Sequence, residues 1–500
     1  MTPADDPPTS AACELARLDA VETAARIRSG ELLAREVVSA AIERAEALDP
    51  ILNAIPARDY DRALEAAKTP GSGPFAGVPT FIKDLDDVAG IVNSHGSRAY
   101  SDNVPKRTDK LIAKILDTGL VCLGKSMTPE FGLTGTTEST AFGPTRNPWK
   151  TTHSPGGSSG GAAALVAAGV VPLAHGSDGG GSIRIPAAFC GLVGLKVSRE
   201  RRFVPAGLDR LPLRVVTYGV VTRTVRDTAH FAAALDQRVA SRRLPRIPLV
   251  RGASERRLRI GFFVTAPSGC SVDSEVAATA LAAAQRCARL GHKVEEIVCP
   301  YDEQLVDDFL LYWSLLAWGS IVQTRLQRRR RFDIECMEPW TRALSARFQS
   351  RRWEVVSALK RLRAARFASE RLFESYDVLI SPTTTAPAPP LGHIGADVLF
   401  ETAFARVRDY FCLTPAQNII GNTAISLPMG MSHEGLPIGV QLSANRGDES
   451  TLLELSYELE GDGALRAPEA PMAYGRTPRK VDLRRPETYR GQGPRCQAEA

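Results

Sequence analysis

The sequence lacks a strong excess of one charge and a long apolar run, and each absence excludes a class of protein. Lys and Arg number 62 against 56 Asp and Glu in 500 residues, which is too small an excess to act as a nucleic-acid footprint by itself. The longest apolar stretch, residues 160–176, contains Pro172 and His175 and falls short of the roughly 20 residues that a membrane-spanning helix needs. We therefore expect neither a membrane segment nor a nucleic-acid partner.

Metal-binding and secretion signals are also missing. The nine cysteines form no C-x-x-C pair, and His433-Glu434 lacks the second histidine of an H-E-x-x-H zinc site. The first residues are acidic and proline-containing where a signal peptide needs a basic and then an apolar region. We expect free thiols in a reducing compartment, a cytoplasmic location, no metal and no cofactor.

The order of predicted elements indicates an α/β fold with a largely parallel central sheet. Residues 19–48 have helical spacing with a break at Gly30, and residues 78–82 form a β-prone run that ends at Lys83. Helices are predicted over 108–117 and 162–168, and apolar strands over 120–123 and 170–173. Strands that alternate with helices favour parallel pairing.

The second half resumes this alternation after an Arg- and Pro-rich stretch, 238–257, which is typical of a connector or long surface loop. Strands are predicted over 258–263 and 377–380, and helices over 274–290 and 352–373. The basic run Arg328–Arg331 lies in a helical insertion. Its default interpretation is a solvated helix face, with an RNA contact as the lesser alternative.

Two Gly/Ser clusters, residues 155–161 and 176–186, are the most unusual feature of the chain. Glycines let consecutive backbone N–H groups converge on one point, as in a phosphate site or an oxyanion hole, although a pair of flexible surface loops is the plain alternative. Neither cluster has the lysine of a P-loop. Residues 156–160 also match G-x-S-x-G, but the preceding residues 151–155 are a poor strand, which argues against a nucleophile elbow at Ser158.

The sequence resembles the amidase-signature hydrolases. The resemblance lies in GGSSGGAAALVAAGVVPLAHGSDGGGSIRIPAAFCGLVGLK at 156–196, GVPTFIKD at 77–84 and GKSMTPEFG at 124–132, with weaker agreement in DVLISPTTTAPAP and NTAISLPMGMSHEGLPIGVQL. It spans nearly the whole chain. It implies one large α/β domain with a central mixed, mostly parallel sheet, helices on both faces and a helical insertion.

The resemblance makes Ser182 the nucleophile, Ser158 the bridging serine with a cis peptide bond, and Lys83 the base. A neutral lysine amine can take the proton of Ser182 through the hydroxyl of Ser158. Lys83 must then titrate near 7 instead of 10.4, which requires burial. Asp84, Asp86 and Asp87 oppose that shift, although strand alternation turns Asp84 to the other face if the strand continues that far. Alone, Lys83 reads as a surface lysine at a strand end.

Backbone N–H groups of Gly179, Gly180, Gly181 and Ser182 are expected to form the oxyanion hole. Gly179 stands where the family usually has a threonine or another side chain, so we expect a looser loop or a different acyl group. Ser159, Asp178 and Arg184 also match the motif as supporting residues. Asp178 and Arg184 are expected to pair and to brace the loop.

These assignments predict the following parts of one domain: an N-terminal helical layer (1–70), the catalytic core (71–240), a connector (241–257), a variable, mostly helical substrate-side segment (258–375), the C-terminal part of the core (376–465) and a flexible tail (477–500). The substrate is expected to be a small-molecule amide, and a homodimer is left open. Trp313, Trp318 and Trp340 are candidates for an apolar acyl pocket, although large aromatics in helices are more often core.

Two alternatives to an amidase remain at this point. One is the glutaminase subunit of a tRNA-dependent amidotransferase, for which Arg328–Arg331 is the single hint. The other is a non-catalytic binding protein, which the presence of Lys83, Ser158 and Ser182 disfavours.

Overall fold

The computed structural model describes residues 8–204, 208, 211–239, 241, 243–465 and 469–473. The predicted flexible tail, 477–500, lies outside these residues. Of the cysteines within them, seven are free thiols, as predicted. Cys336 is disulfide-bonded, so the expectation of free thiols throughout is wrong there.

The strands form one large and two small sheets. The strands are β1 (Ala57–Arg58), β2 (Pro79–Lys83), β3 (Val121–Ser126), β4 (Glu138–Ser139), β5 (Gly143–Pro144), β6 (Leu173–Asp178), β7 (Val193–Lys196), β8 (Thr217–Thr222), β9 (Arg259–Phe262), β10 (Lys293–Glu296), β11 (Val378–Pro382), β12 (Thr423–Met431) and β13 (Pro437–Ala444). The large sheet has eight strands in the order β10-β9-β11-β13-β12-β7-β8-β6, and the small sheets are β1-β3-β2 and β4-β5. The chain therefore has the predicted mixed central sheet.

The prediction of mostly parallel pairing is wrong. In the large sheet only β10–β9 and β9–β11 pair in parallel, whereas the other five pairs are antiparallel. The unit from β6 through a helix to β7 accounts for two of these five pairs. Both strands pair antiparallel with β8, which the chain inserts between them. Alternation of strands and helices favours parallel pairing of neighbouring strands but cannot show that a later strand is inserted between them.

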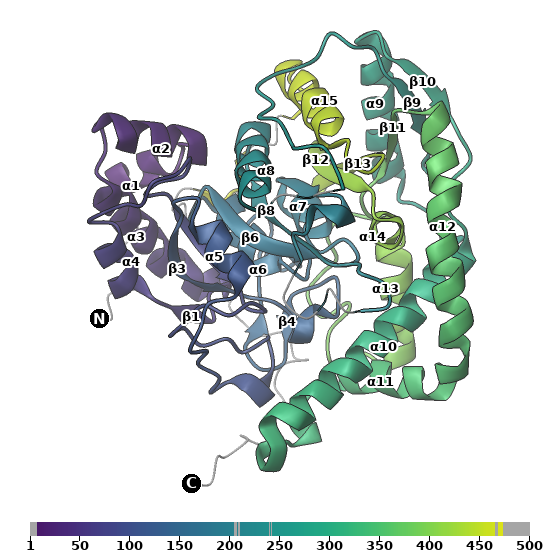
Figure 1. Cartoon of the computed structure of the whole chain (residues 1–500), viewed down its shortest axis with the longest axis horizontal. Coiled ribbons are helices and arrows are strands. Elements are labelled where there is room, and N and C mark those ends of the chain that lie inside the picture. Colours follow the sequence, from purple (N-terminus) through teal and green to yellow (C-terminus); the bar gives the residue numbers. More distant parts are fainter. Residues whose placement is uncertain are drawn as a thin grey trace.

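Helices cover the sheet, with the N-terminal layer at one end and the long helices at the other (Figure 1). The helices are α1 (Ser10–Leu15), α2 (Ala20–Ser29), α3 (Ala34–Leu52), α4 (Tyr60–Ala66), α5 (Lys110–Leu116), α6 (Gly160–Ala167), α7 (Arg184–Cys190), α8 (Val225–Val239), α9 (Ser274–Arg289), α10 (Glu303–Arg328), α11 (Pro339–Arg351), α12 (Val355–Ser375), α13 (Phe400–Phe411), α14 (Pro415–Ile420) and α15 (Glu449–Gly461). The predicted single α/β domain with helices packed on its sheet is confirmed.

Most predicted boundaries lie within a few residues of the observed ones. Gly30 ends α2 in the left-handed conformation, with φ 79°, as the predicted break requires. One predicted strand is misplaced: the apolar run 170–173 predicts a strand, but β6 begins only at Leu173 and continues to Asp178. The first two of those residues, Val170 and Val171, are instead buried in the loop between α6 and β6. An apolar run alone does not separate a buried loop from a strand.

The connector and the insertion are more closely tied to the core than predicted. Residues 243–257 contain no helix or strand, as expected, yet Ile247 and Val250 are buried at 3% and 7% exposure in the main apolar cluster. The segment 258–375 contributes β9 and β10 to the large sheet in addition to its helices. The first part of this segment therefore belongs to the central sheet, whereas the long helices that follow form a separate layer.

One helix among the described residues, Glu303–Arg331 (α10 and the turn that follows it), has the length and composition of a membrane-crossing helix. The expectation of no such segment rested on residues 160–176 and overlooked this stretch. Within its apolar window 44% is buried, and α10 contacts α11, α12 and α14. Helices that pack into a protein core meet the same test of length and composition.

Candidate active site

Lys83 lies at the end of β2, fully buried, with its amine surrounded by serine oxygens. Its Nζ is 2.7 Å from Ser158 Oγ, 2.9 Å from Ser159 Oγ and 3.0 Å from Ser177 Oγ, and the carbonyl oxygen of Ser177 is 3.5 Å away. Ser158 and Ser159 precede α6, whereas Ser177 is on β6, beside β2. Sequence reasoning missed Ser177, although its place before Asp178 in the second Gly/Ser cluster was a usable signal.

Burial controls the ionisation of Lys83. Removal from water lowers the pKa of its amine to about 7, and the negative charges of Asp86 and Asp178 act against that shift. Of the three aspartates expected to oppose it, Asp86 does so. Asp84 turns instead to the backbone N–H and hydroxyl of Ser94. Strand alternation does not account for this orientation, because β2 ends at Lys83. A substantial fraction of the amine is therefore neutral near pH 7.

Ser158 follows a cis peptide bond, Gly157–Ser158, as the resemblance implied. The loop is held close to its neighbours: a Cβ added at Gly157 would lie 2.6 Å from the backbone oxygen of Thr136. Thr137 Oγ1 donates a hydrogen bond of 2.8 Å to the carbonyl of Gly156. Glycine at 157 thus lets the backbone of residues 136–137 approach the loop that carries Ser158.

Ser182 precedes α7 and lies at the boundary of two cavities, at 8% exposure. Its hydroxyl makes no hydrogen bond with another residue that the structure describes. The same holds for the backbone N–H groups of Gly179, Gly180 and Ser182. The N–H of Gly181, in contrast, donates to Asp178 Oδ1 at 2.8 Å. It is already engaged, so the predicted set of four oxyanion donors is reduced to three.

Asp178 and Arg184 form the predicted ion pair. Arg184 Nη2 lies 2.9 Å from Asp178 Oδ1 and its Nε 3.0 Å from Oδ2, with both side chains fully buried. Burial raises the pKa of Asp178, but the charge and hydrogen bonds of Arg184 outweigh it, so the pKa is well below its ordinary value. Asn418 and Gln441 accept from Arg184 at 2.6 Å each. Sequence reasoning missed both, because they come from the far C-terminal part of the chain.

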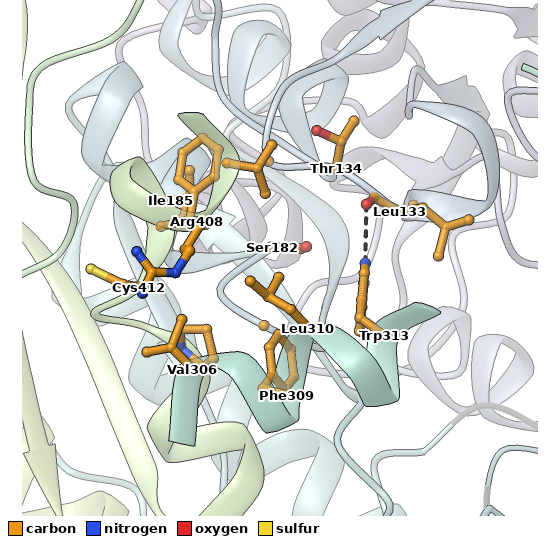
Figure 2. A pocket seen from close by; sticks show the side chains of 16 residues that line it. Leu133, Thr134, Ser182, Ile185, Val306, Phe309, Leu310, Trp313, Arg408 and Cys412 are labelled. Carbon is orange, nitrogen blue, oxygen red and sulfur yellow. Dashed lines mark hydrogen bonds between the residues drawn. The ribbon is translucent and has the colours of Figure 1, made fainter. Parts of the chain in front are cut away.

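Two cavities meet at Ser182. The smaller, about 50 Å³, is mostly apolar, and Figure 2 shows Ser182 facing the side chains of α10 across it. The larger, about 640 Å³, is polar over much of its wall and is lined by Ser158, Ser177 and Gly179. Gly132, Ser182 and Trp313 line both.

The three tryptophans predicted for an acyl pocket have different positions. Trp313 lines both cavities and donates from Nε1 to the carbonyl of Leu133 at 3.0 Å (Figure 2). Trp340 donates to the same carbonyl at 3.1 Å but is not part of either cavity wall. Trp318 is 37% exposed and packs against Phe348. Of the three tryptophans, Trp313 alone lines a cavity at Ser182, and its role in an acyl pocket stays a prediction.

The basic run Arg328–Arg331 has intramolecular partners. Arg328 pairs with Asp102 and lies over the ring of Tyr100, 5.3 Å from its centroid. Arg331 Nη1 lies 3.5 Å from the other carboxylate oxygen of Asp102. The run thus contributes two side chains to a surface contact within the chain, and Arg328 also lines the larger cavity.

Within the described ranges, no group of three or more His, Cys, Asp or Glu side chains is arranged to hold a metal ion. The lysine, the three serines and the free backbone N–H groups are the chemically distinctive groups around Ser182. They can supply a nucleophile, a proton acceptor and hydrogen-bond donors for a developing negative charge.

Comparisons with known proteins identify the family of the chain. Residues 36–453 match the family model Amidase. A Mycobacterium bovis protein named "Putative amidase AmiC" is 43% identical over 450 residues, covering 89% of this chain and 94% of that one. The 6-aminohexanoate-cyclic-dimer hydrolase of Paenarthrobacter ureafaciens is 35% identical over 489 residues, with coverage of 89% and 94%.

Solved structures give the same result. A structure of 6-aminohexanoate cyclic dimer hydrolase complexed with substrate has a TM-score of 0.80 and 32% identity, covering 92% of this chain and 99% of that chain. A bacterial aryl acylamidase of the amidase signature family has a TM-score of 0.81 and 28% identity, with the same coverage. The chain therefore belongs to the amidase family and is an enzyme that hydrolyses amide C–N bonds.

Proposed function

We propose that the enzyme cleaves a small-molecule carboxamide through an acyl-enzyme on Ser182, with Ser158 as proton relay and Lys83 as base. The observation that carries the proposal is the buried amine of Lys83, 2.7 Å from Ser158 Oγ, with only neutral oxygens as direct partners. Such an environment favours the neutral amine, the form that can accept a proton.

In the first half of the reaction, Ser182 Oγ attacks the carbonyl carbon as its proton passes to Ser158 Oγ, whose own proton moves to Lys83 Nζ. The carbonyl π electrons move to oxygen, and the N–H groups of Gly179, Gly180 and Ser182 stabilise the oxyanion. When the C–N bond breaks, the proton returns from Lys83 through Ser158 to the leaving nitrogen. The products are the Ser182 ester and a free amine or ammonia.

In the second half, water loses its proton through the same relay and attacks the ester carbon. The ester C–O bond then breaks, Ser182 regains its proton, and the carboxylic acid leaves and ionises. No step consumes an oxidant, a reductant or a second substrate other than water.

Asp178 and Arg184 position the loop that presents Ser182, since Asp178 also accepts from the N–H groups of Gly181 and Ile183. Ser159 and Ser177 accept the remaining hydrogens of the Lys83 amine, which leaves its lone pair for the Ser158 hydroxyl. A cytoplasmic location, the absence of nucleic-acid and membrane partners, and a homodimer stay predictions. The amidotransferase alternative loses its hint, because Arg328 and Arg331 pair with Asp102.

The test is hydrolysis of aryl and aliphatic amides by the isolated chain, with glutamine alongside. Ser182→Ala and Lys83→Ala are each expected to lower kcat/KM at least about a thousandfold, because they remove the nucleophile and its base. Ser154→Ala is the matched control, a buried serine near the first Gly/Ser cluster that does not contact Lys83. Full activity in Ser182→Ala would contradict the proposal, and hydrolysis of glutamine alone would favour the amidotransferase.

A further inference from the structure

Gly179 departs from the usual family pattern, and the structure supplies a reason for glycine there. A Cβ added at Gly179 would lie 3.0 Å from Cη2 of Trp313 and 3.1 Å from Cγ2 of Val216. The φ of Gly179 is outside the left-handed range, so its backbone conformation accepts other residues. A side chain at position 179 would therefore press on the indole and on Val216, whereas the turn itself does not demand glycine.

Trp313 is held firmly in this position. Its Nε1 donates to the Leu133 carbonyl at 3.0 Å, and its ring stacks on Phe309 with 5.4 Å between centroids. Phe309 in turn packs against the next glycine: a Cβ at Gly180 would lie 2.9 Å from Phe309 Cζ. Two aromatic residues one turn apart on α10 thus cover two consecutive glycines of the proposed oxyanion loop.

The indole of Trp313 separates the two cavities that meet at Ser182. Gly132, Ser182 and Trp313 are the described residues that line both, and of these Trp313 alone has a large side chain. Gly180 lines the small cavity and Gly179 the large one. Removing the indole would therefore join about 50 Å³ of apolar space to about 640 Å³ of more polar space.

The position of the proton relay assigns one cavity to each part of the substrate. Ser158 must reach the leaving nitrogen, and Ser158 lines the large cavity and not the small one. The amine part of the substrate then occupies the large cavity, and the acyl chain extends from Ser182 into the small one. Arg408, in the small cavity, is paired with Glu303, Asp307 and Asp409, so its charge is not left for a substrate carboxylate.

We propose that Trp313, for which Gly179 leaves room, is the residue that restricts this enzyme to amides with a short apolar acyl group and a larger amine part. This inference rests on the function proposed above. Trp313 acts as a wall between two subsites, and we assign it no part in the proton transfers.

The test is a series of p-nitroanilides with acyl chains from acetyl to octanoyl. For the wild type we expect kcat/KM to fall at least tenfold between butanoyl and octanoyl. In Trp313→Ala the octanoyl-to-acetyl ratio should rise at least tenfold, since each methylene that enters an apolar site is worth roughly fourfold. An unchanged ratio in Trp313→Ala, or a wild type that accepts every acyl length while rejecting large amines, would overturn the assignment.

Trp340 provides the matched control. Trp313→Phe and Trp340→Phe both remove a donor to the Leu133 carbonyl, but only the first alters a cavity wall. We expect Trp340→Phe to keep the wild-type acyl profile and Trp313→Phe to broaden it. Equal broadening of the acyl profile in both variants would assign the effect to the lost hydrogen bond. It would overturn the role of Trp313 as a wall between the cavities. Should Trp313→Ala fail to fold, Trp313→Leu carries the same comparison.

A double substitution tests the contact with Gly179. Gly179→Thr alone should lower kcat/KM for the acetyl substrate at least tenfold, because the added atoms meet the indole. In the Trp313→Ala background the same change should cost less than threefold. Equal losses in both backgrounds would overturn the pairing. Failure of the proposed function is distinct from these outcomes, because it would appear as no hydrolysis by the wild type or as full activity in Ser182→Ala.

Discussion

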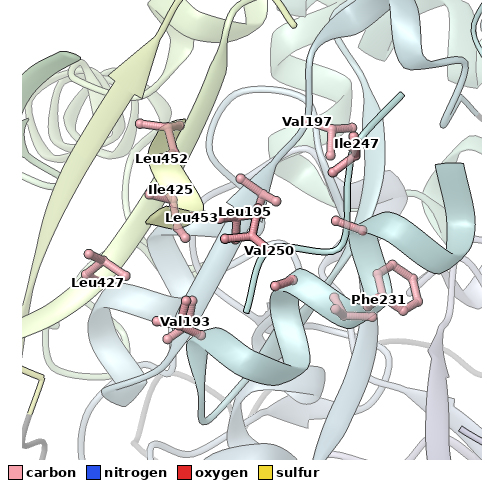
Figure 3. Packing of buried hydrophobic residues seen from close by; sticks show 14 of the residues in the cluster. Val193, Leu195, Val197, Phe231, Ile247, Val250, Ile425, Leu427, Leu452 and Leu453 are labelled. Atoms are coloured by element: carbon pink, nitrogen blue, oxygen red, sulfur yellow. The ribbon is translucent and has the colours of Figure 1, made fainter. Parts of the chain in front are cut away.

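The two faces of β7 differ in what they support. Val193 and Leu195 point into an apolar cluster with Phe231 of α8 and side chains of β12 and α15 (Figure 3). Gly194, between them, faces the other way, where its missing Cβ leaves room for Ile183 and Ala187. Ile183 directly follows Ser182. One face of a single strand therefore supplies stability, and the other lets the helix that follows the proposed nucleophile pack on the sheet.

The two faces of β7 should tolerate substitutions differently. An apolar cluster is built from many interchangeable contacts, so losing one side chain costs free energy without moving a reacting group. On the glycine face, backbone and side-chain atoms would lie within 3.0 Å of any added carbon, so an insertion must displace the Ser182 segment.

The largest combined effect is expected for Gly194→Val. A Cβ there would lie 2.8 Å from the Cβ of Ala187 and 3.0 Å from the carbonyl oxygen of Ile183. We expect a loss of roughly 1–3 kcal/mol in the free energy of unfolding from overpacking, together with at least a tenfold fall in kcat. Denaturant titration and steady-state kinetics measure the two. A variant with wild-type kcat would contradict the role of the glycine face in positioning Ser182.

Leu195→Ala should separate stability from activity. The side chain is 4% exposed, and truncation of a buried leucine costs about 2–5 kcal/mol. Because the cavity forms on the side away from Ser182, kcat at 25 °C should stay within twofold of the wild type. Urea unfolding checks the first value and initial rates the second. A fall in kcat comparable with that of Gly194→Val would contradict the division between the faces.

Lys83→Met should stabilise the protein while it abolishes activity. Folding depresses the pKa of Lys83 from 10.5 to about 7. Between these two pKa values the unfolded chain binds a proton at Lys83 that the folded protein does not bind, so the free energy of unfolding of the wild type rises with pH. Below pH 7 the full cost of burying the charged amine is present. We expect the variant to gain roughly 1–3 kcal/mol in unfolding free energy at pH 7.

The pH dependence of that gain is the check. It should shrink as the pH rises toward 10.5 and vanish there. Thermal or denaturant unfolding at several pH values measures it. A gain that does not change between pH 7 and 10 would mean that the charge of Lys83 is not its source.

The smallest effect concerns Asp86. Its negative charge raises the pKa of Lys83 against burial. Activity requires the neutral amine and should rise with pH through about 7, so Asp86→Asn should move this rise in kcat/KM to lower pH, by up to about one unit. Asp87→Asn is the control, since Asp87 lines the large cavity together with Asp86 but is not among the charges that shift the pKa of Lys83. Equal displacement in both variants would contradict the assignment.

The sequence predicted the site better than the sheet. A short ordered set of motifs indicated that Lys83, Ser158 and Ser159 lie together. Each of them is within a few residues of a glycine or a strand end that sets its position. The pairing of β6 and β7 with β8 was not predictable, since it depends on which strand the chain inserts later. Asn418 and Gln441 lie more than 100 residues from Arg184, which they contact, and local patterns carry no information about such contacts.

In the proposed mechanism, Ser182 becomes acylated through the Lys83–Ser158 relay. Mass spectrometry of the intact protein and of its peptides tests this directly. The enzyme is mixed with an acetyl p-nitroanilide or the corresponding p-nitrophenyl ester at pH 8, and the reaction is then quenched with acid. We expect one acetyl group on the peptide that contains Ser182, none in Ser182→Ala, and slower appearance of the acetyl group in Lys83→Ala. An acetyl group on Ser158 or another residue, or an equal rate of labelling in Lys83→Ala, would contradict it.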